Sequence, residues 1–252
     1  PSTRTRGSFM IAAHRFGVGF ANIVDSVATT SIRKGETFAD TVETVVAMKP
    51  DLLLMRYGDS VEVDTILKKV KLPVINGGSG TSGHPTQALL DAFTIIETRG
   101  QVQGEKILII GDVIHSRVAN SNLQLMRQMG AEVAVCGPEE MLTSDGKWSD
   151  VRRFYNIDEA IAWSTVSMGL RLQKERHTSQ DLSLGHYIEN FRIDAKRLAQ
   201  LPEDAIFMHP GPHVVGVDLM PEVLEDKRCQ IRRQVANGVF IRAAIMSLIL
   251  GF

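Results

Sequence analysis

The first seven residues, PSTRTRG, combine three hydroxyl side chains with two arginines directly before an apolar pattern of helical spacing. The start of a helix leaves several backbone N–H groups unpaired and carries positive partial charge, so it attracts anions. Hydroxyl donors and a guanidinium at such a start favour a phosphate site. A solvated helix cap uses the same residue types, so this segment alone leaves both interpretations open.

Further cationic and imidazole groups follow the expected strands, at the end of a sheet where doubly wound folds bind ligands. They are Arg56 after LLLM, His84 after GGSGTSG, Arg117 in GDVIHSR, Arg171 in LRLQ, and the HPGP loop at 209–212. Because guanidinium groups bind phosphate and carboxylate through paired hydrogen bonds, these arginines and Arg4 predict polyanionic ligands. Each group also has a purely structural interpretation; Arg56, for example, could be solvated. Asp112, in the same GDVIHSR motif as Arg117, could cap a helix. GDVIHSR lacks the glycine pattern of a dinucleotide site, which weakens the hypothesis of an oxidoreductase.

The elements that must position these groups alternate between helices and strands. Helical patterns cover residues 8–17, 37–48, 61–70, 84–100, 116–131 and 237–251, with Thr37 as a capping residue. Strand patterns cover residues 18–24, 51–57, 72–76, 106–112, 132–138 and 204–208. The segment at 158–173 continues the second series, with VSMGL directly before Arg171. The sequence therefore predicts an α/β fold with two doubly wound parallel-sheet subdomains, joined by the helix around residues 84–99. The first subdomain is expected at 1–99, completed by a C-terminal helix at 235–252, and the second at 104–234.

The composition, net charge and cysteine count argue against several classes of protein. The chain has 252 residues, 44% of them hydrophobic, and a formal net charge of −1, which favours neither a nucleic-acid partner nor a membrane surface. Cys136 and Cys229 lack disulfide or zinc spacing, which predicts a reducing, cytoplasmic setting, and Cys136 is expected in the core. The apolar stretch 239–252 contains Arg242 and is expected to be too short to cross a bilayer. We see no signal peptide, and because the chain begins without Met we expect a piece of a longer protein or a processed product.

The order of seven short motifs carries a resemblance. STRTR, KGET, MRY, HPTQALLD, GDVIHSRVANSN, RLQKER and HPGP resemble, in that order, the catalytic chains of the aspartate transcarbamoylase family. Each piece alone is weakly specific, but together they cover essentially the whole chain. The resemblance implies a transcarbamoylase-like fold and transfer of the carbamoyl group of carbamoyl phosphate to the amine of L-aspartate. This reaction is an early step of pyrimidine synthesis, and it requires neither a metal nor an organic cofactor.

The resemblance also implies a role for each matching residue. The residues implied to bind carbamoyl phosphate are Ser2, Thr3, Arg4, Thr5, Ser31, Lys34, Arg56, His84, Gln87, Pro210 and Gly211. Within this set the implied catalytic groups are Thr5, Lys34, Arg56 and His84. The residues implied to bind aspartate are Lys34, Arg117, Arg171 and Gln173.

Two of these residues are implied to come from a neighbouring subunit. Lys34 and a serine a few residues before it reach into the neighbour's site in this family. Thr30 and Ser31 both fit the position of that serine, and we prefer Ser31. The shared site implies a homotrimer, and regulatory chains or a dihydroorotase are further candidate partners.

Two alternative functions stay open, and the chain departs from the family pattern at two places. Ornithine transcarbamoylases typically have a cysteine where this chain has Thr86, and HCLP where it has HPGP. A structural or regulatory homologue without activity would lose catalytic groups that are present here. Met10 stands where the family usually has glutamate, and His213 to Gly216 replace a usual Asn-Arg-Gly. The family's opening strand and helices, which precede STRTR, are expected to be missing.

Overall fold

The computed structural model describes residues 3–21, 37–58, 61–80, 82–143, 146–173 and 184–251, with no side-chain detail at 61–63. The chain divides into two compact units, Pro1–Thr86 with Gly238–Phe252, and Gln87–Asn237. Helices α4 (Pro85–Arg99) and α9 (Ile231–Leu250) contribute residues to both units. The units differ from the expected subdomains mainly at α4, most of which belongs to the second unit.

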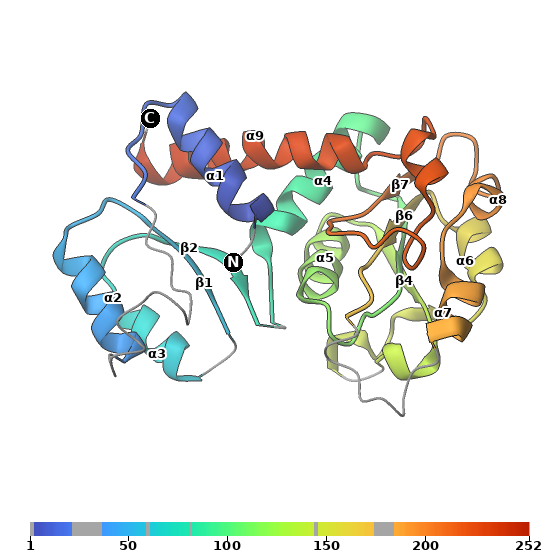
Figure 1. Ribbon diagram of the computed structural model, residues 1–252, viewed down its shortest axis with the longest axis horizontal. Coiled ribbons are helices and arrows are strands. Elements are labelled where there is room, and N and C mark those ends of the chain that lie inside the picture. The colour runs from blue at the N-terminus through green and yellow to red at the C-terminus, as the bar shows by residue number, and fades with distance from the viewer. Residues whose placement is uncertain are drawn as a thin grey trace. The chain divides into compact units, whose positions relative to one another are not determined.

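The first unit is built around a short parallel sheet (Figure 1). Its elements are α1 (Thr3–Arg15), α2 (Phe38–Ala47), β1 (Leu53–Tyr57), α3 (Val61–Lys69), β2 (Val74–Ser79) and the second half of α9. In α1, the spacing of Phe9, Ala12 and Ala13 places them on one buried face. This face packs with Ile75 of β2 and Met246 of α9 in one apolar cluster, so the cluster joins both helices to the sheet.

Local patterns predicted most, but not all, of the first unit. Helix α2 begins after Thr37, whose side chain and backbone exchange hydrogen bonds with Asp40 in a capping box, as the sequence predicts. The expected strand at 18–24 is wrong for residues 18–21, because the Val18 N–H bonds back to the carbonyl of Ala13 and closes the end of α1. Residues 22–24 lie outside the described residues. Strand β2 also runs to Ser79, through glycines expected in a loop.

The second unit is a five-stranded parallel sheet with helices on both faces. Its strands are β3 (Lys106–Ile110), β4 (Glu132–Cys136), β5 (Arg152–Phe154), β6 (Val166–Gly169) and β7 (Ile206–Met208), in the order β5-β4-β3-β6-β7. Its further helices are α5 (Arg117–Gln128), α6 (Ile157–Trp163), α7 (Leu184–Phe191) and α8 (Ala195–Leu198), with short 3₁₀ turns at Glu139–Met141, Gly146–Trp148 and Pro221–Glu225. The sequence analysis did not predict β5, α7 or α8.

The side chains of β3 point alternately to the two faces of the sheet, and helices cover both faces. Ile107 and Ile109 pack in a cluster with α4 and α5, whereas Leu108 and Ile110 pack in a second cluster with α6 and α7. Successive side chains of a strand point to opposite faces, so a wholly apolar strand requires cover on both. Cys136 is fully buried in the second cluster, which confirms the core position predicted for it, and burial raises the pKa of its thiol to about 12.

The strand order contains a topological switch point. The central strand β3 pairs with β4 on one side and with β6 on the other. The loops that follow β3 and β6 therefore leave the carboxyl edge of the sheet on either side of the point where the winding reverses. In open α/β sheets this position binds ligands.

Helix α9 is longer than the sequence pattern predicted. It begins at Ile231 rather than 237, and by length and composition alone it could cross a membrane, a test that buried core helices also pass. The expectation that this apolar segment is too short therefore fails for the whole helix. Its Gln234, Asn237 and Arg242 are buried and hydrogen-bonded to neighbouring side chains, which is the character of a core helix.

Candidate functional site

Thr5 and His84 meet in the first unit although 79 residues separate them. Thr5 lies in the first turn of α1, and His84 directly precedes Pro85, the first residue of α4. Both residues are buried, and Thr5 Oγ1 lies 3.3 Å from His84 Nε2. The fold thus brings together a hydroxyl and an imidazole that the sequence analysis assigned to one task.

The environment of His84 keeps its imidazole neutral. Burial, together with the positive charges of Arg242 and Arg56, lowers the pKa of His84 to about 3 from an ordinary value of 6.5. Near neutral pH the ring therefore carries one N–H donor and no charge. Arg56, in β1, acts on the ring through its charge, so Thr5, Arg56 and His84 belong to one electrostatic environment within this unit.

Arg242 is a functional candidate that the sequence analysis missed. This α9 residue is only 3% exposed, its Nη1 donates a hydrogen bond to Ser8 Oγ at 2.8 Å, and its guanidinium lies 5.4 Å from the ring centroid of Phe9. Ser8 Oγ is in turn 2.6 Å from the carbonyl oxygen of Arg4. Arg242 therefore supports the turn of α1 that carries the predicted phosphate-binding residues. A single arginine within an apolar helical run was the signal, since buried arginines need partners.

The predicted residues at the start of α1 are only partly described. Thr3 and Arg4 lie in the first turn and are exposed, which leaves their side chains accessible to an anion. Ser2 lies outside the described residues, as do Ser31, Lys34 and the alternative Thr30.

In the second unit, Asp112 and Gln173 tie together the two loops at the switch point. Asp112 is fully buried; its Oδ1 lies 2.9 Å from His115 Nδ1, and its Oδ2 accepts the backbone N–H of Gln173 at 3.3 Å. Gln173 Nε2 donates to the carbonyl oxygen of His115 at 2.9 Å. The suggested role of Asp112 as a helix cap is wrong, because Ser116 caps α5. A buried carboxylate instead fixes the distance between the loops.

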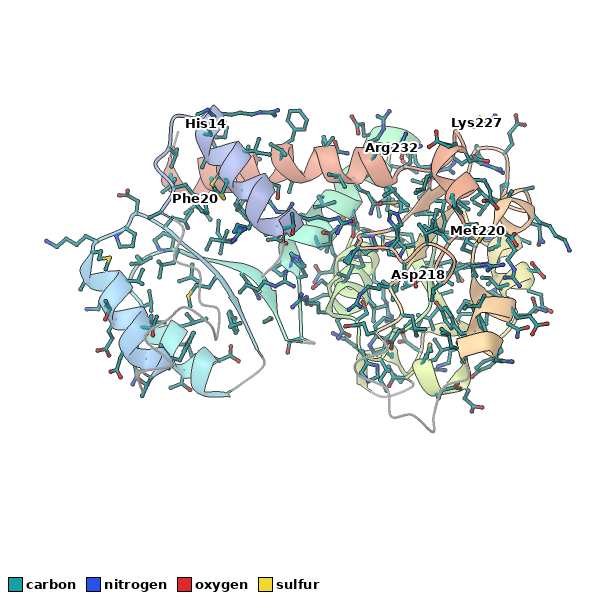
Figure 2. All side chains as sticks on the ribbon, viewed as in Figure 1. His14, Phe20, Asp218, Met220, Lys227 and Arg232 are labelled. Atoms are coloured by element: carbon teal, nitrogen blue, oxygen red, sulfur yellow. The ribbon has the colours of Figure 1, made fainter. Side chains whose placement is uncertain are left out.

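The two predicted aspartate anchors lie on these loops. Arg117 is the first residue of α5, Arg171 follows β6, and both are half-buried. Next to Arg171, the backbone N–H of Leu172 donates to Asp218 Oδ1 at 3.1 Å. Asp218 is buried in the loop that follows β7 (Figure 2), and sequence analysis did not identify it. Asp218 therefore holds a third loop against the one that carries Arg171.

The predicted HPGP loop follows β7. The backbone N–H of Gly211 donates to His209 Nδ1 at 2.9 Å, and the Gly211–Pro212 peptide bond is cis. Residues 213–216, which depart from the family pattern, form the next part of this loop. There the Val214 N–H donates to Asp218 Oδ2 at 2.6 Å. Met10, the other departure, is 39% exposed on α1.

The predicted residues thus form two sets. The first unit contains Thr3, Arg4, Thr5, Arg56 and His84, and the second contains Gln87, Arg117, Arg171, Gln173, Pro210 and Gly211. Gln87 lies in the first turn of α4, is buried, and donates its Nε2 to Asp91 Oδ1 at 2.9 Å.

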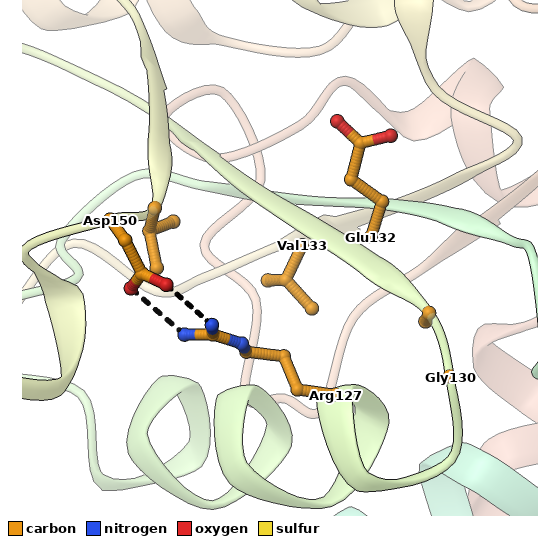
Figure 3. A pocket seen from close by; sticks show the side chains of 7 residues that line it. Arg127, Gly130, Glu132, Val133 and Asp150 are labelled. Atoms are coloured by element: carbon orange, nitrogen blue, oxygen red, sulfur yellow. Dashed lines mark hydrogen bonds and ion pairs between the residues drawn. The ribbon is translucent and has the colours of Figure 1, made fainter.

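A hollow of about 370 Å³ lies elsewhere on the second unit (Figure 3). It is lined by Arg127, Gly130, Ala131, Glu132, Val133, Asp150 and Val151. The guanidinium of Arg127 forms two hydrogen bonds with Asp150, at 3.0 and 2.6 Å. The hollow is at the amino end of β4, whereas the residues of predicted chemistry follow the carboxyl ends of the strands, so we do not assign it to substrate.

Comparison with known families also gives two domains, with a boundary after α4 rather than at its start. Residues 1–97 match the family model of the aspartate/ornithine carbamoyltransferase carbamoyl-P binding domain, and residues 103–249 match that of the Asp/Orn binding domain. The chain belongs to the aspartate/ornithine carbamoyltransferase family. The family resemblance drawn from the seven motifs is therefore confirmed.

The similar curated proteins include aspartate carbamoyltransferase catalytic subunits. The chain is 44% identical to the aspartate carbamoyltransferase catalytic subunit of Desulfitobacterium hafniense over 251 residues, which are 99% of this chain and 80% of the relative. It is 45% identical to the subunit of that name from Acetivibrio thermocellus, over 98% of this chain and 79% of the relative.

Solved structures give the same likeness and confirm the predicted fold. Aspartate transcarbamoylase of Trypanosoma cruzi, in complex with carbamoyl aspartate and phosphate, is similar with a TM-score of 0.88 and 32% identity, over 98% of this chain and 79% of that one. The same enzyme in complex with N-(phosphonacetyl)-L-aspartic acid gives a TM-score of 0.84 and 33% identity, with the same coverage.

Proposed function

We propose that this chain transfers the carbamoyl group of carbamoyl phosphate to the α-amine of L-aspartate, which yields N-carbamoyl-L-aspartate and phosphate. The observation that carries the proposal is the match of nearly the whole chain to a carbamoyl-phosphate domain followed by an aspartate/ornithine domain. The relatives named above are aspartate enzymes, and this favours aspartate over ornithine. The product places the reaction at an early step of pyrimidine synthesis.

The first unit supplies the groups for the phosphate and the carbonyl. The exposed Thr3 and Arg4 lie at the positive end of α1, which suits the phosphate. Thr5 and the neutral His84 lie 3.3 Å apart and, with Arg56, donate to the carbonyl oxygen as it gains negative charge. Such donors stabilise the transition state because they are already oriented before the reaction begins.

The second unit supplies the groups for the amino acid. Arg117 and Arg171 each pair with one carboxylate of aspartate, and Gln173 completes the site. Ornithine carries an amine in place of the second carboxylate, so the same two cations disfavour it. The carbonyl oxygens of Pro210 and Gly211 accept hydrogen bonds from the reacting amine.

The reaction is a direct displacement. The amine nitrogen bonds to the carbonyl carbon, the bond from that carbon to the phosphate oxygen breaks, and the departing phosphate accepts the proton from the amine. This route needs no covalent intermediate on the enzyme. Holding both substrates in reacting geometry supplies a large part of the acceleration.

Phosphate release with aspartate or ornithine as acceptor tests the proposal. We expect turnover with aspartate and little above the background rate with ornithine. Arg171→Ala should require much more aspartate and serves as a matched control for contaminating activity. Faster turnover with ornithine would refute the aspartate assignment, and no turnover with either acceptor would favour a structural or regulatory homologue.

We also propose a cytoplasmic homotrimer whose sites are shared between subunits. The KGET motif supports this, because the family uses the lysine that corresponds to Lys34, and the serine for which we chose Ser31, to complete the neighbouring site. The two cysteines are free, which fits a reducing compartment. Regulatory chains or a dihydroorotase are the partners that the family suggests.

Mixing two inactive variants tests the shared site. Lys34→Ala and His84→Ala are combined under conditions that exchange subunits, and each variant alone is treated identically as a control. If sites are shared, some interfaces pair an intact Lys34 with an intact His84, so part of the activity returns. No recovery after demonstrated exchange would mean that each chain forms its own site.

A further inference from the structure

One buried carboxylate in the second unit, that of Asp91, receives three side-chain amides. Gln87 Nε2 and Gln234 Nε2 each donate to Asp91 Oδ1 at 2.9 Å, and Asn122 Nδ2 donates to Oδ2 at 2.9 Å. Asp91 itself is 0% exposed. The donors lie on α4, α9 and α5, so a single side chain joins three helices.

The orientation of the Gln234 amide follows from its other neighbour. The backbone N–H of His209 lies 2.8 Å from Gln234 Oε1, and a backbone N–H can only donate. The oxygen of Gln234 must therefore face His209, so its NH₂ group must face Asp91. Asp91 Oδ1 is thus an acceptor.

Asn122 also turns its NH₂ toward Asp91, and this leaves its Oδ1 buried and without a hydrogen-bond partner among the described residues. The same Nδ2 donates to the carbonyl oxygen of Val118 at 3.1 Å. An unsatisfied buried acceptor is destabilising, so the bonds to the carboxylate and to this carbonyl together must outweigh it.

The same constraint acts on Gln87. Its Nε2 shares Asp91 Oδ1 with Gln234, so the amide oxygen of Gln87 points away from Asp91 and can act only as an acceptor. The resemblance to the family implies that Gln87 binds carbamoyl phosphate, beside the carbamoyl group. That group ends in NH₂, a donor, where acetyl phosphate has a methyl group.

We propose that Asp91 is a positioning residue that makes this chain prefer carbamoyl phosphate to acyl phosphates. It holds the NH₂ of Gln87 inward, so Oε1 meets the carbamoyl NH₂ as an acceptor. The inference rests on the proposed function. Through Gln234 and Asn122 the same carboxylate also fixes the backbone at His209 and the helix that begins at Arg117.

The test compares binding of three ligands to the intact enzyme without aspartate. The ligands are carbamoyl phosphate, acetyl phosphate and inorganic phosphate, and the key variant is Asp91→Leu, which has a similar volume but no acceptor for the NH₂ of Gln87. Asp91→Asn would not serve, because Gln234 would keep the amide oxygen of the new side chain at the position of Oδ1. Asn237→Ala is the matched control, because Asn237 is buried on the same pair of helices and donates to Thr94 at 3.0 Å. A structural defect at this helix contact should affect both variants.

We expect Asp91→Leu to weaken carbamoyl phosphate about tenfold, the effect of losing one buried hydrogen bond, and to leave the other two ligands within about twofold. Asn237→Ala should preserve the wild-type ratio. In a Gln87→Ala background, Asp91→Leu should have no further effect on the ratio. An unchanged ratio in Asp91→Leu, or an equal loss for all three ligands, would overturn the inference. Failure of the wild type to form N-carbamoyl-aspartate would instead overturn the proposed function.

A second measurement uses the unaltered enzyme, so it does not depend on the folding of Asp91→Leu. The side-chain amide signals of Gln87 are assigned in an NMR spectrum by their loss in Gln87→Ala. Because Asp91 buries and binds this NH₂, we expect its hydrogens to exchange slowly with solvent. Rapid exchange would show that the NH₂ does not face Asp91, and would overturn the inference.

Discussion

His84 should make the stability of this protein depend on pH, and His84→Gln should remove that dependence. The pKa of His84 is about 3 in the folded protein and 6.5 ordinarily. Between these values the unfolded chain binds a proton that the folded chain does not. The free energy of unfolding therefore falls as pH falls below about 6.5, and the contribution is present in full only above that pH.

The size of the effect follows from these two pKa values. At about pH 5 the imidazole is almost fully protonated in the unfolded chain and almost fully neutral in the folded one. Proton linkage then gives a loss of about 2 kcal/mol between about pH 7.5 and pH 5. Any folded pKa below about 4 gives the same result, so this pH interval tests the neutrality of His84 rather than its exact pKa.

Urea unfolding at both pH values measures the effect in the wild type and in His84→Gln at equal protein concentration. The wild type should lose about 2 kcal/mol more than the variant on acidification. His14→Gln is the matched control: His14 is exposed, so this variant should keep the wild-type loss. Equal losses in wild type and His84→Gln would refute the neutral imidazole and its role as an uncharged donor.

Three further substitutions separate the proposed roles. Arg56→Ala should lower kcat by about 10²–10³, as loss of one oxyanion donor does, with little change in the KM for aspartate; an effect on KM alone would contradict this. Arg171→Ala should raise the KM for aspartate and leave the directly measured affinity for carbamoyl phosphate nearly unchanged, and a parallel fall of both would refute the separation. Arg242→Leu removes a positive charge near His84, so NMR titration should show a higher pKa for His84, and an unchanged value would exclude that influence.

Local signals explain which elements could be predicted. The capping box of Thr37 and Asp40 marks the start of α2 within four residues, and the apolar run of β3 indicates a strand buried on both faces. The strand expected at 18–24 had a suitable composition. The structure instead uses residues 16–18 to end α1, through local hydrogen bonds to Ala12, Ala13 and His14 that strand composition alone does not reveal.

The carboxylates that organise the second unit carried no such signal. Asp112 acts on a residue 61 positions away, Asp218 on one 46 positions away, and Asp91 on one 143 positions away. Each lies in an ordinary loop or helix pattern, and only the fold supplies its partners. The motifs therefore predicted residues that the family uses on substrates, whereas the residues that hold them became visible only in the structure.

The central claim is that this chain forms a new C–N bond on aspartate. Carbamoyl phosphate labelled with ¹³C at the carbonyl is incubated with aspartate and the purified protein, and the label is followed by NMR while phosphate release is measured in parallel. We expect labelled N-carbamoyl-aspartate in equal amount to the phosphate released, with no carbamoyl-ornithine when ornithine replaces aspartate. Phosphate release with the label recovered in bicarbonate, and none on aspartate, would contradict it.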